Sequence, residues 1–135
     1  MIIMTSLIKR ISKDTKNLNC CIVVGNAFGN LEDISDTFNT VFILSNEMKD
    51  FKKKNIVYRN SFDNIHEIPH IDAVFFDADQ LESIPKLETV LRKNRLLIYI
   101  GSKDIPSLYY FRFLESCKYE VTEIQKHYHK WTPKR

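Results

Sequence analysis

The chain alternates between two kinds of apolar pattern. Short continuous runs rich in β-branched residues are typical of strands buried on both faces of a parallel sheet, whereas apolar residues spaced three or four apart are typical of amphipathic helices. The runs predict five buried strands, at 20–25, 40–44, 55–59, 71–77 and 95–101. A further segment, 119–125, alternates apolar and polar residues, which predicts a half-exposed edge strand that could run antiparallel to the others.

Helical spacing fills the intervals between these strands. The last interval gives the clearest example: Asp104 is expected as its N-cap and Pro106 lies in its first turn. Pro85 is expected in the first turn of the preceding helix, and a lysine-rich helix is expected at 47–54. The residues expected on buried helix faces are Leu31, Ile34, Phe38, Met48, Phe51, Leu87, Val90, Leu91, Leu108, Phe111, Leu114 and Cys117, with Tyr109, Tyr110 and Phe113 as core or core-edge aromatics.

Strands that alternate with helices form βαβ units, which pack into a parallel sheet with right-handed crossovers. The sequence therefore predicts an α/β fold: a three-layer α/β/α sandwich around a mostly parallel, Rossmann-like sheet of about six strands. The expected order is 3-2-1-4-5, with the last strand at the edge beyond the fifth. One Rossmann-like domain is expected over 1–135, with an N-terminal amphipathic helix at 1–18 and an α/β core at 19–135.

Composition bears on the cellular compartment of the protein but does not identify its function. The 135 residues are 44% hydrophobic and 27% charged, with a net charge of +3, which permits an anionic ligand without demanding nucleic acid. Cys20, Cys21 and Cys117 form no disulfide framework, so a reducing compartment fits best. The apolar N-terminus is too short to span a membrane and no basic region precedes it, so neither membrane attachment nor a signal peptide is expected. The expected location is the cytoplasm.

The candidate ligand-binding and catalytic residues lie where the first and fourth strands end. In the predicted order these strands are neighbours at the topological switch point, so Gly25, Asn26 and Gly29 should meet Asp77 and Asp79 there. This loop could bind a polar or anionic ligand, and the carboxylates could contact a ligand amine or act as a base. The alternative is structural: a tight turn made by the glycines, and capping by Asp79. Two carboxylates are too few for a hard cation, so no metal is expected.

These elements resemble the class I S-adenosylmethionine-dependent methyltransferases. The segment Ile71-Asp-Ala-Val-Phe-Phe-Asp-Ala-Asp79 is similar to their fourth-strand motif, especially in the small-molecule O-methyltransferases. The family's acidic residue followed by Gly-x-Gly-x-Gly matches Val23-Val-Gly25-Asn-Ala27-Phe-Gly29. Here Val23 stands at the acidic position and Ala27 at the middle glycine. The family's usual final β-hairpin is expected to be absent or reduced to one strand.

The resemblance implies an S-adenosylmethionine site. Its acidic contact to the ribose would fall near Ser45 or Asn46, and Glu47 comes slightly later in the chain. Glu47 is better explained as a first-turn glutamate favoured by the helix dipole. The loop 60–63 would cover the adenine, and Asp77 or Asp79 would be the catalytic base. The implied cofactor-binding residues are Gly25, Asn26, Ala27, Gly29, Asn46, Glu47, Ser61, Phe62 and Asp77.

Three functions remain open from the sequence. The first is a small methyltransferase-like domain that binds S-adenosylmethionine or a related nucleoside, with its activity undecided. The second is a non-catalytic module that acts through a protein partner or by forming a homo-oligomer. The missing acidic ribose residue near Ser45 or Asn46, Ala27 in place of the middle glycine, and the small size of the chain favour this alternative. The third is an RNA-binding surface, which the small net charge does not favour over an ordinary solvated face. It would use Lys49, Lys52, Lys53, Lys54, Arg59, His127, Tyr128, His129, Lys130, Trp131, Lys134 and Arg135. His127 and His129, two apart on an expected strand, should face the same side, but no third metal ligand accompanies them.

Overall fold

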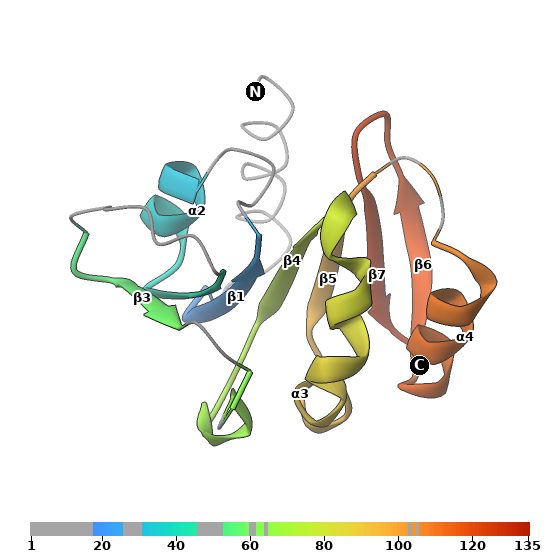
Figure 1. Ribbon diagram of the computed structural model, residues 1–135, viewed down its shortest axis with the longest axis horizontal. Coiled ribbons are helices and arrows are strands. Elements are labelled where there is room, and N and C mark those ends of the chain that lie inside the picture. The colour runs from blue at the N-terminus through green and yellow to red at the C-terminus, as the bar shows by residue number, and fades with distance from the viewer. Residues whose placement is uncertain are drawn as a thin grey trace.

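The protein is described here by a computed structural model, which covers residues 18–25, 31–45, 53–59, 62–63, 65–102, 104 and 106–135. Its centre is a seven-stranded sheet in the order β3-β2-β1-β4-β5-β7-β6 (Figure 1). The predicted α/β fold class is confirmed, with one strand more than expected. The strands are β1 (Cys20–Val24), β2 (Thr40–Leu44), β3 (Ile56–Arg59), β4 (Ala73–Asp77), β5 (Leu97–Gly101), β6 (Tyr119–Ile124) and β7 (His129–Pro133).

The first five strands are parallel to one another and lie in the predicted order 3-2-1-4-5. β1 and β4 pair in the middle of the sheet, with Val24 opposite Phe76. Every residue of β1 is buried, as are the first four of β4, because helices or other segments cover both faces of these strands. The continuous apolar runs in the sequence are the direct consequence of that two-sided burial.

The C-terminal strands correct the expectation of a missing or shortened hairpin. β6 and β7 form a complete antiparallel hairpin, and β7 inserts between β5 and β6. Because β7 runs antiparallel to both neighbours, β6 runs in the same direction as β5, so the antiparallel strand is β7 and not the edge strand. The edge position of 119–125 is confirmed, but this strand lies one place further out than expected.

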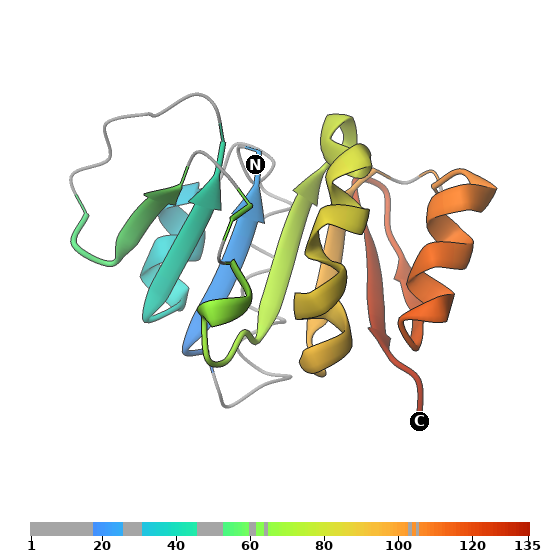
Figure 2. The ribbon, with the colours of Figure 1, turned by 60° about the horizontal axis from the view of Figure 1, so that its bottom comes forward.

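Helices cover both faces of the sheet (Figure 2). On one face α2 (Leu31–Thr37) packs on a core cluster that includes Ile34 and Phe75. On the other face lie η2 (Ile65–Glu67), η3 (Ala78–Leu87), α3 (Glu88–Lys93) and α4 (Leu108–Ser116), over a larger cluster that includes Trp131. Two solvent-shielded cores separated by the sheet make the predicted three-layer sandwich.

Two predicted helix starts are wrong. α4 begins at Leu108, with Ser107 in the N-cap position, so Asp104 and Pro106 lie ahead of the helix and not within its first turn. Pro85 belongs to the 3₁₀ segment η3, and α3 begins after it, at Glu88. Proline has no backbone N–H to donate and disfavours the α conformation of the preceding residue, Ile84, so the α-helical hydrogen-bond pattern begins after this pair.

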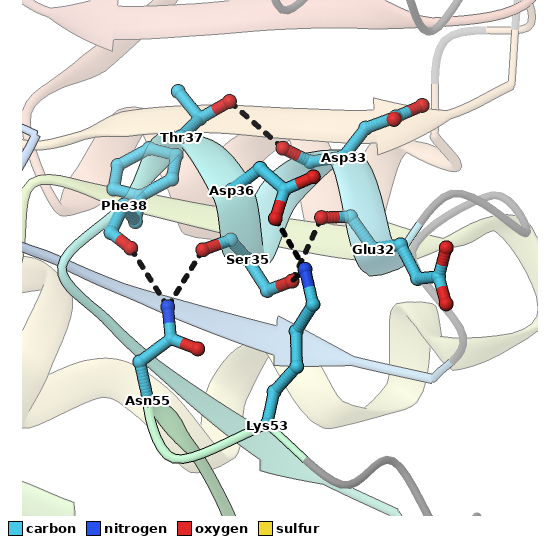
Figure 3. Close-up of polar contacts among 8 residues, drawn as sticks. All are labelled: Glu32, Asp33, Ser35, Asp36, Thr37, Phe38, Lys53 and Asn55. Carbon is cyan, nitrogen blue, oxygen red and sulfur yellow. Dashed lines mark hydrogen bonds and ion pairs between the residues drawn. The ribbon is translucent and has the colours of Figure 1, made fainter.

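The last turn of α2 is fastened to the turn before β3 (Figure 3). The Asn55 side-chain amide donates hydrogen bonds to the carbonyl oxygens of Ser35, at 2.6 Å, and Phe38, at 3.1 Å. The Lys53 ammonium donates to the Ser35 hydroxyl at 3.0 Å and pairs with the Asp36 carboxylate. Asn55 thereby satisfies two carbonyls at the C-terminus of α2, and the Lys53 cation is favourably placed at the negative end of the helix dipole. Most of the helix expected at 47–54 lies outside the described residues.

The cysteines are free and buried. Burial and the nearby Asp72 raise the pKa of Cys20 to about 11, and burial also raises the pKa of Cys21 and Cys117. Thiols with raised pKa values are poor nucleophiles, as expected for core cysteines. Within the described residues, no helix is long and apolar enough to cross a membrane.

Candidate functional site

The candidate site lies at the carboxyl edge of the sheet, between β1 and β4. The chain leaves β1 toward α2 on one face of the sheet, whereas it leaves β4 directly into η3 on the other face. Two neighbouring parallel strands whose connections diverge in this way define a topological switch point, which is where open α/β sheets bind ligands. The last residues at this point are Gly25 and Asp77.

Gly25 and Asp77 are in direct contact across the switch point. Gly25 has a φ of +99°, and its N–H donates to the Leu44 carbonyl at 3.3 Å. A Cβ atom placed on Gly25 would lie 2.4 Å from Oδ2 of Asp77 and 2.8 Å from its Cγ. The half-buried Asp77 carboxylate therefore covers the Gly25 backbone, and both the backbone conformation and the contact require glycine at this position.

The two predicted carboxylates have different environments. Asp77 precedes η3 with an extended backbone, and its side chain makes no capping hydrogen bond to that segment. Asp79 is exposed within the first turn of η3, so it does not act as the N-cap that the structural alternative required. Asp77 thus lies over the Gly25 backbone, whereas Asp79 is exposed in the first turn of η3.

The other predicted cofactor contacts are only partly described. Phe62 is half-buried and packs against the larger core cluster, with the Lys86 ammonium 5.3 Å from the centre of its ring. The remaining predicted contacts lie outside the described residues, and they are Asn26, Ala27, Gly29, Asn46, Glu47 and Ser61. Among the predicted site residues, the contact between Gly25 and Asp77 is therefore the part whose geometry the structure describes.

A buried histidine beside the carboxyl edge was not among the predicted site residues. His129, at the start of β7, is 0% exposed, and its Nδ1 lies 2.6 Å from the Ser102 carbonyl. Because a carbonyl only accepts, Nδ1 carries the proton and Nε2 holds the lone pair. Within the described structure Nε2 has no hydrogen-bond partner. His127 is exposed in the hairpin turn, so the expectation that the two histidines share one side of a strand is wrong.

Burial lowers the pKa of His129 below its usual 6.5, and the bond to Ser102 opposes this only in part. Protonation therefore favours the unfolded chain. We expect the free energy of unfolding to fall as the pH drops below about 6.5, by at most about 1.4 kcal/mol per pH unit from this residue. Urea denaturation at several pH values would measure the loss. His129→Asn keeps a donor toward Ser102 but does not titrate, so an unchanged pH profile in this variant would contradict the assignment.

The two aromatic residues that the proposed RNA surface would use for stacking are buried. Trp131 is 0% exposed and packs edge-to-face on Phe111, with ring centroids 5.2 Å apart. Tyr128 is buried and donates to the Glu123 carboxylate at 2.9 Å. Side chains held in the core cannot stack on bases, so these aromatics belong to the fold. Among the described residues, no cluster of three or more His, Cys, Asp or Glu side chains could hold a metal ion.

The fold matches solved methyltransferase structures along nearly its whole length. A precorrin-6y C5,15-methyltransferase from Geobacter metallireducens shares 17% identity at a TM-score of 0.65, covering 97% of this chain and 87% of that one. An rRNA methylase from Streptococcus thermophilus shares 12% at 0.61, covering 96% and 95%. A putative methyltransferase from Streptococcus mutans in complex with SAH shares 14% at 0.59, covering 93% and 92%.

The chain has the class I methyltransferase-like Rossmann fold. The resemblance first seen in 71–79 and in the β1 loop is thereby confirmed at the level of the fold. The complete β6–β7 hairpin removes one of the departures from the family pattern that the sequence suggested. No family model and no curated protein matches this sequence. At 12–17% identity, the solved structures that match establish the methyltransferase-like architecture and not a shared reaction.

Proposed function

We propose that this chain is a small methyltransferase-like domain that binds S-adenosylmethionine, or a related nucleoside, between β1 and β4. The observation that carries the proposal is the contact of the Asp77 carboxylate with the Gly25 backbone at the switch point of the sheet. The contact places a carboxylate, a charged hydrogen-bond acceptor, at the switch point where open α/β sheets bind ligands.

The chemistry of this pair suits such a ligand. S-adenosylmethionine carries an ammonium group and ribose hydroxyls, and a carboxylate accepts hydrogen bonds from both kinds of group. Such charge-assisted bonds are about twice as strong as neutral ones. When bound, the cofactor would supply an activated methyl group. The chain would hold an acceptor oxygen or nitrogen in line with that group, and Asp77 or the exposed Asp79 would take the acceptor's proton.

Thermal unfolding with candidate ligands tests the proposal. We expect S-adenosylmethionine and S-adenosylhomocysteine, each at about 1 mM, to raise the melting temperature, whereas NAD and ATP should not. A ligand at about 100 times its Kd stabilises the native state by about 2.7 kcal/mol, a shift of several degrees for a chain of this size. Asp77→Ala should abolish the shift, and Glu67→Ala, which removes an exposed carboxylate on η2, should leave it intact.

A flat response to both adenosyl compounds would contradict the proposal. It would favour the non-catalytic module that acts through a protein partner or by self-association. An equal shift with Asp77→Ala would place the ligand elsewhere on the protein, and would remove Gly25 and Asp77 from the proposed site.

A further inference from the structure

Two buried polar atoms on β7 lack a hydrogen-bond partner. His129 and Trp131 are both 0% exposed. Within the described structure, neither Nε2 of His129 nor Nε1 of Trp131 makes a hydrogen bond. Buried polar atoms are nearly always bonded to protein or to ordered water, because an unpaired one loses its hydration without compensation. Two such atoms on one strand therefore require a physical explanation.

The two rings lie on the same face of the sheet. Residues two apart on a strand point to the same side. The ring centroids of His129 and Trp131 are 6.3 Å apart, close to the spacing of about 6.6 Å between such residues along a strand. Trp131 packs edge-to-face on Phe111 of α4, so this is the face that α4 covers. The imidazole and the indole thus lie side by side in the same layer of the core.

The hydrogen bond at Nδ1 of His129 determines where its Nε2 points. Nδ1 lies 2.6 Å from the carbonyl oxygen of Ser102. His129 pairs with Ile100, and Ser102 lies beyond the end of β5, so this bond runs toward the carboxyl edge of the sheet. Nε2 is on the opposite side of the imidazole ring. It is therefore directed away from the carboxyl edge, which is the direction in which β7 runs on to Trp131.

The two unpaired atoms are complementary. Because Nδ1 of His129 carries the proton, Nε2 only accepts, whereas the indole N–H of Trp131 only donates. They do not bond to each other directly. One water molecule can accept from the indole and donate to the imidazole. Two bonds of about 2.9 Å that meet at a tetrahedral angle join nitrogens about 4.7 Å apart, a separation that rings with centroids 6.3 Å apart allow.

We propose that His129 and Trp131 form a binding site for a single internal water molecule. The water completes a chain of hydrogen bonds from the Ser102 carbonyl at the end of β5, through the imidazole, to the indole that packs on α4. Among the described residues, the buried polar or charged side chains are Ser35, Ser83 and His129. No buried charge is present among them to hold an ion, so the site takes a neutral molecule.

NMR of the unmodified chain tests the site directly. Hε1 of His129 and Hδ1 of Trp131 are carbon-bound, so neither exchanges with solvent, and each is attached beside one of the two unpaired nitrogens. We expect both protons to show cross-peaks to water, with the opposite signs in NOESY and ROESY spectra that a long-lived bound water gives. Nitrogen shifts of the His129 ring should place its proton on Nδ1.

A variant and a matched control identify the partners of the water. His129→Leu removes the acceptor and should abolish the water cross-peak of Trp131, because a water with one polar partner is not retained in an apolar core. Tyr128→Phe removes a buried hydroxyl from the adjacent residue, which belongs to the core on the other face of the sheet. This control should leave both cross-peaks unchanged.

Four results would overturn the proposal. They are the absence of water cross-peaks in the unmodified chain, a proton on Nε2 of His129 in place of Nδ1, a nitrogen–nitrogen coupling that shows a direct bond between His129 and Trp131, and survival of the Trp131 cross-peak in His129→Leu. The first three are read from the unmodified chain, so they decide the proposal even if His129→Leu does not fold.

Discussion

Replacing Gly25 by alanine is expected to abolish binding of S-adenosylmethionine and S-adenosylhomocysteine and to destabilise the fold by about 1–3 kcal/mol. The φ of +99° costs an L-residue on the order of 1–2 kcal/mol. The new methyl group would also lie 2.4 Å from Oδ2 of Asp77, a separation that no pair of atoms tolerates, so the carboxylate must move. The position of that carboxylate is the feature that the proposed ligand site requires.

The two contributions can be separated with a second variant. Chemical denaturation gives the stability loss, and calorimetric titration with S-adenosylhomocysteine gives the affinity. In Gly25→Ala/Asp77→Ala the contacts with Oδ2 and Cγ are gone, whereas the 3.1 Å contact with the Cβ of residue 77 and the backbone strain remain. The double variant should therefore lose less stability than the sum of the two single changes. Additive losses would mean that Asp77 does not lie over Gly25 in solution, which would contradict the site geometry.

Trp131→Ala is expected to cost about 3–5 kcal/mol, which is a large share of the stability of a domain of this size. Trp131 is among the largest fully buried side chains, and it packs edge-to-face on Phe111 of α4. It lies on β7, which pairs with both β5 and β6, so the cavity would loosen the hairpin and its covering helix together. In the described structure its indole N–H has no hydrogen-bond partner, so Trp131→Phe should cost less.

Urea denaturation of the two variants measures these costs. Tyr109→Ala is the matched control, because it removes an aromatic ring of α4 that is 65% exposed and should change stability by less than about 0.5 kcal/mol. If Trp131→Ala were no more harmful than this control, β7 would not be packed between β5 and β6.

The central sheet was predictable because its chemistry is unambiguous. A run such as 71–77 is apolar at nearly every position only where both faces are covered, and it ends at Asp77 where the strand meets solvent. The order of strands follows from right-handed crossovers. That order alone places Gly25 beside Asp77, so the central pair of the candidate site could be inferred from the sequence.

The C-terminal hairpin could not be inferred in the same way. The sequence of β7, His-Lys-Trp-Thr-Pro, has only one strongly apolar residue and resembles a polar tail. Its burial depends on partners distant in sequence: His129 is satisfied at Nδ1 by Ser102, and Trp131 by Phe111. Leu108 and Tyr109 were expected in the core or at its edge but are 64% and 65% exposed. Helical periodicity did not reveal this, because it does not show how much of a helix its neighbours cover.

The most direct test of the proposed cofactor site is an amide NMR titration with S-adenosylhomocysteine. The chain has only three glycines, Gly25, Gly29 and Gly101, so the Gly25 amide signal can be followed with little overlap. We predict that the amides of Gly25 and Asp77 shift together and saturate with the same Kd, while those at the amino ends of β1 and β4 remain in place. If both amides stay unmoved at millimolar ligand, or if the shifts map to another part of the protein, the cofactor site proposed here is wrong.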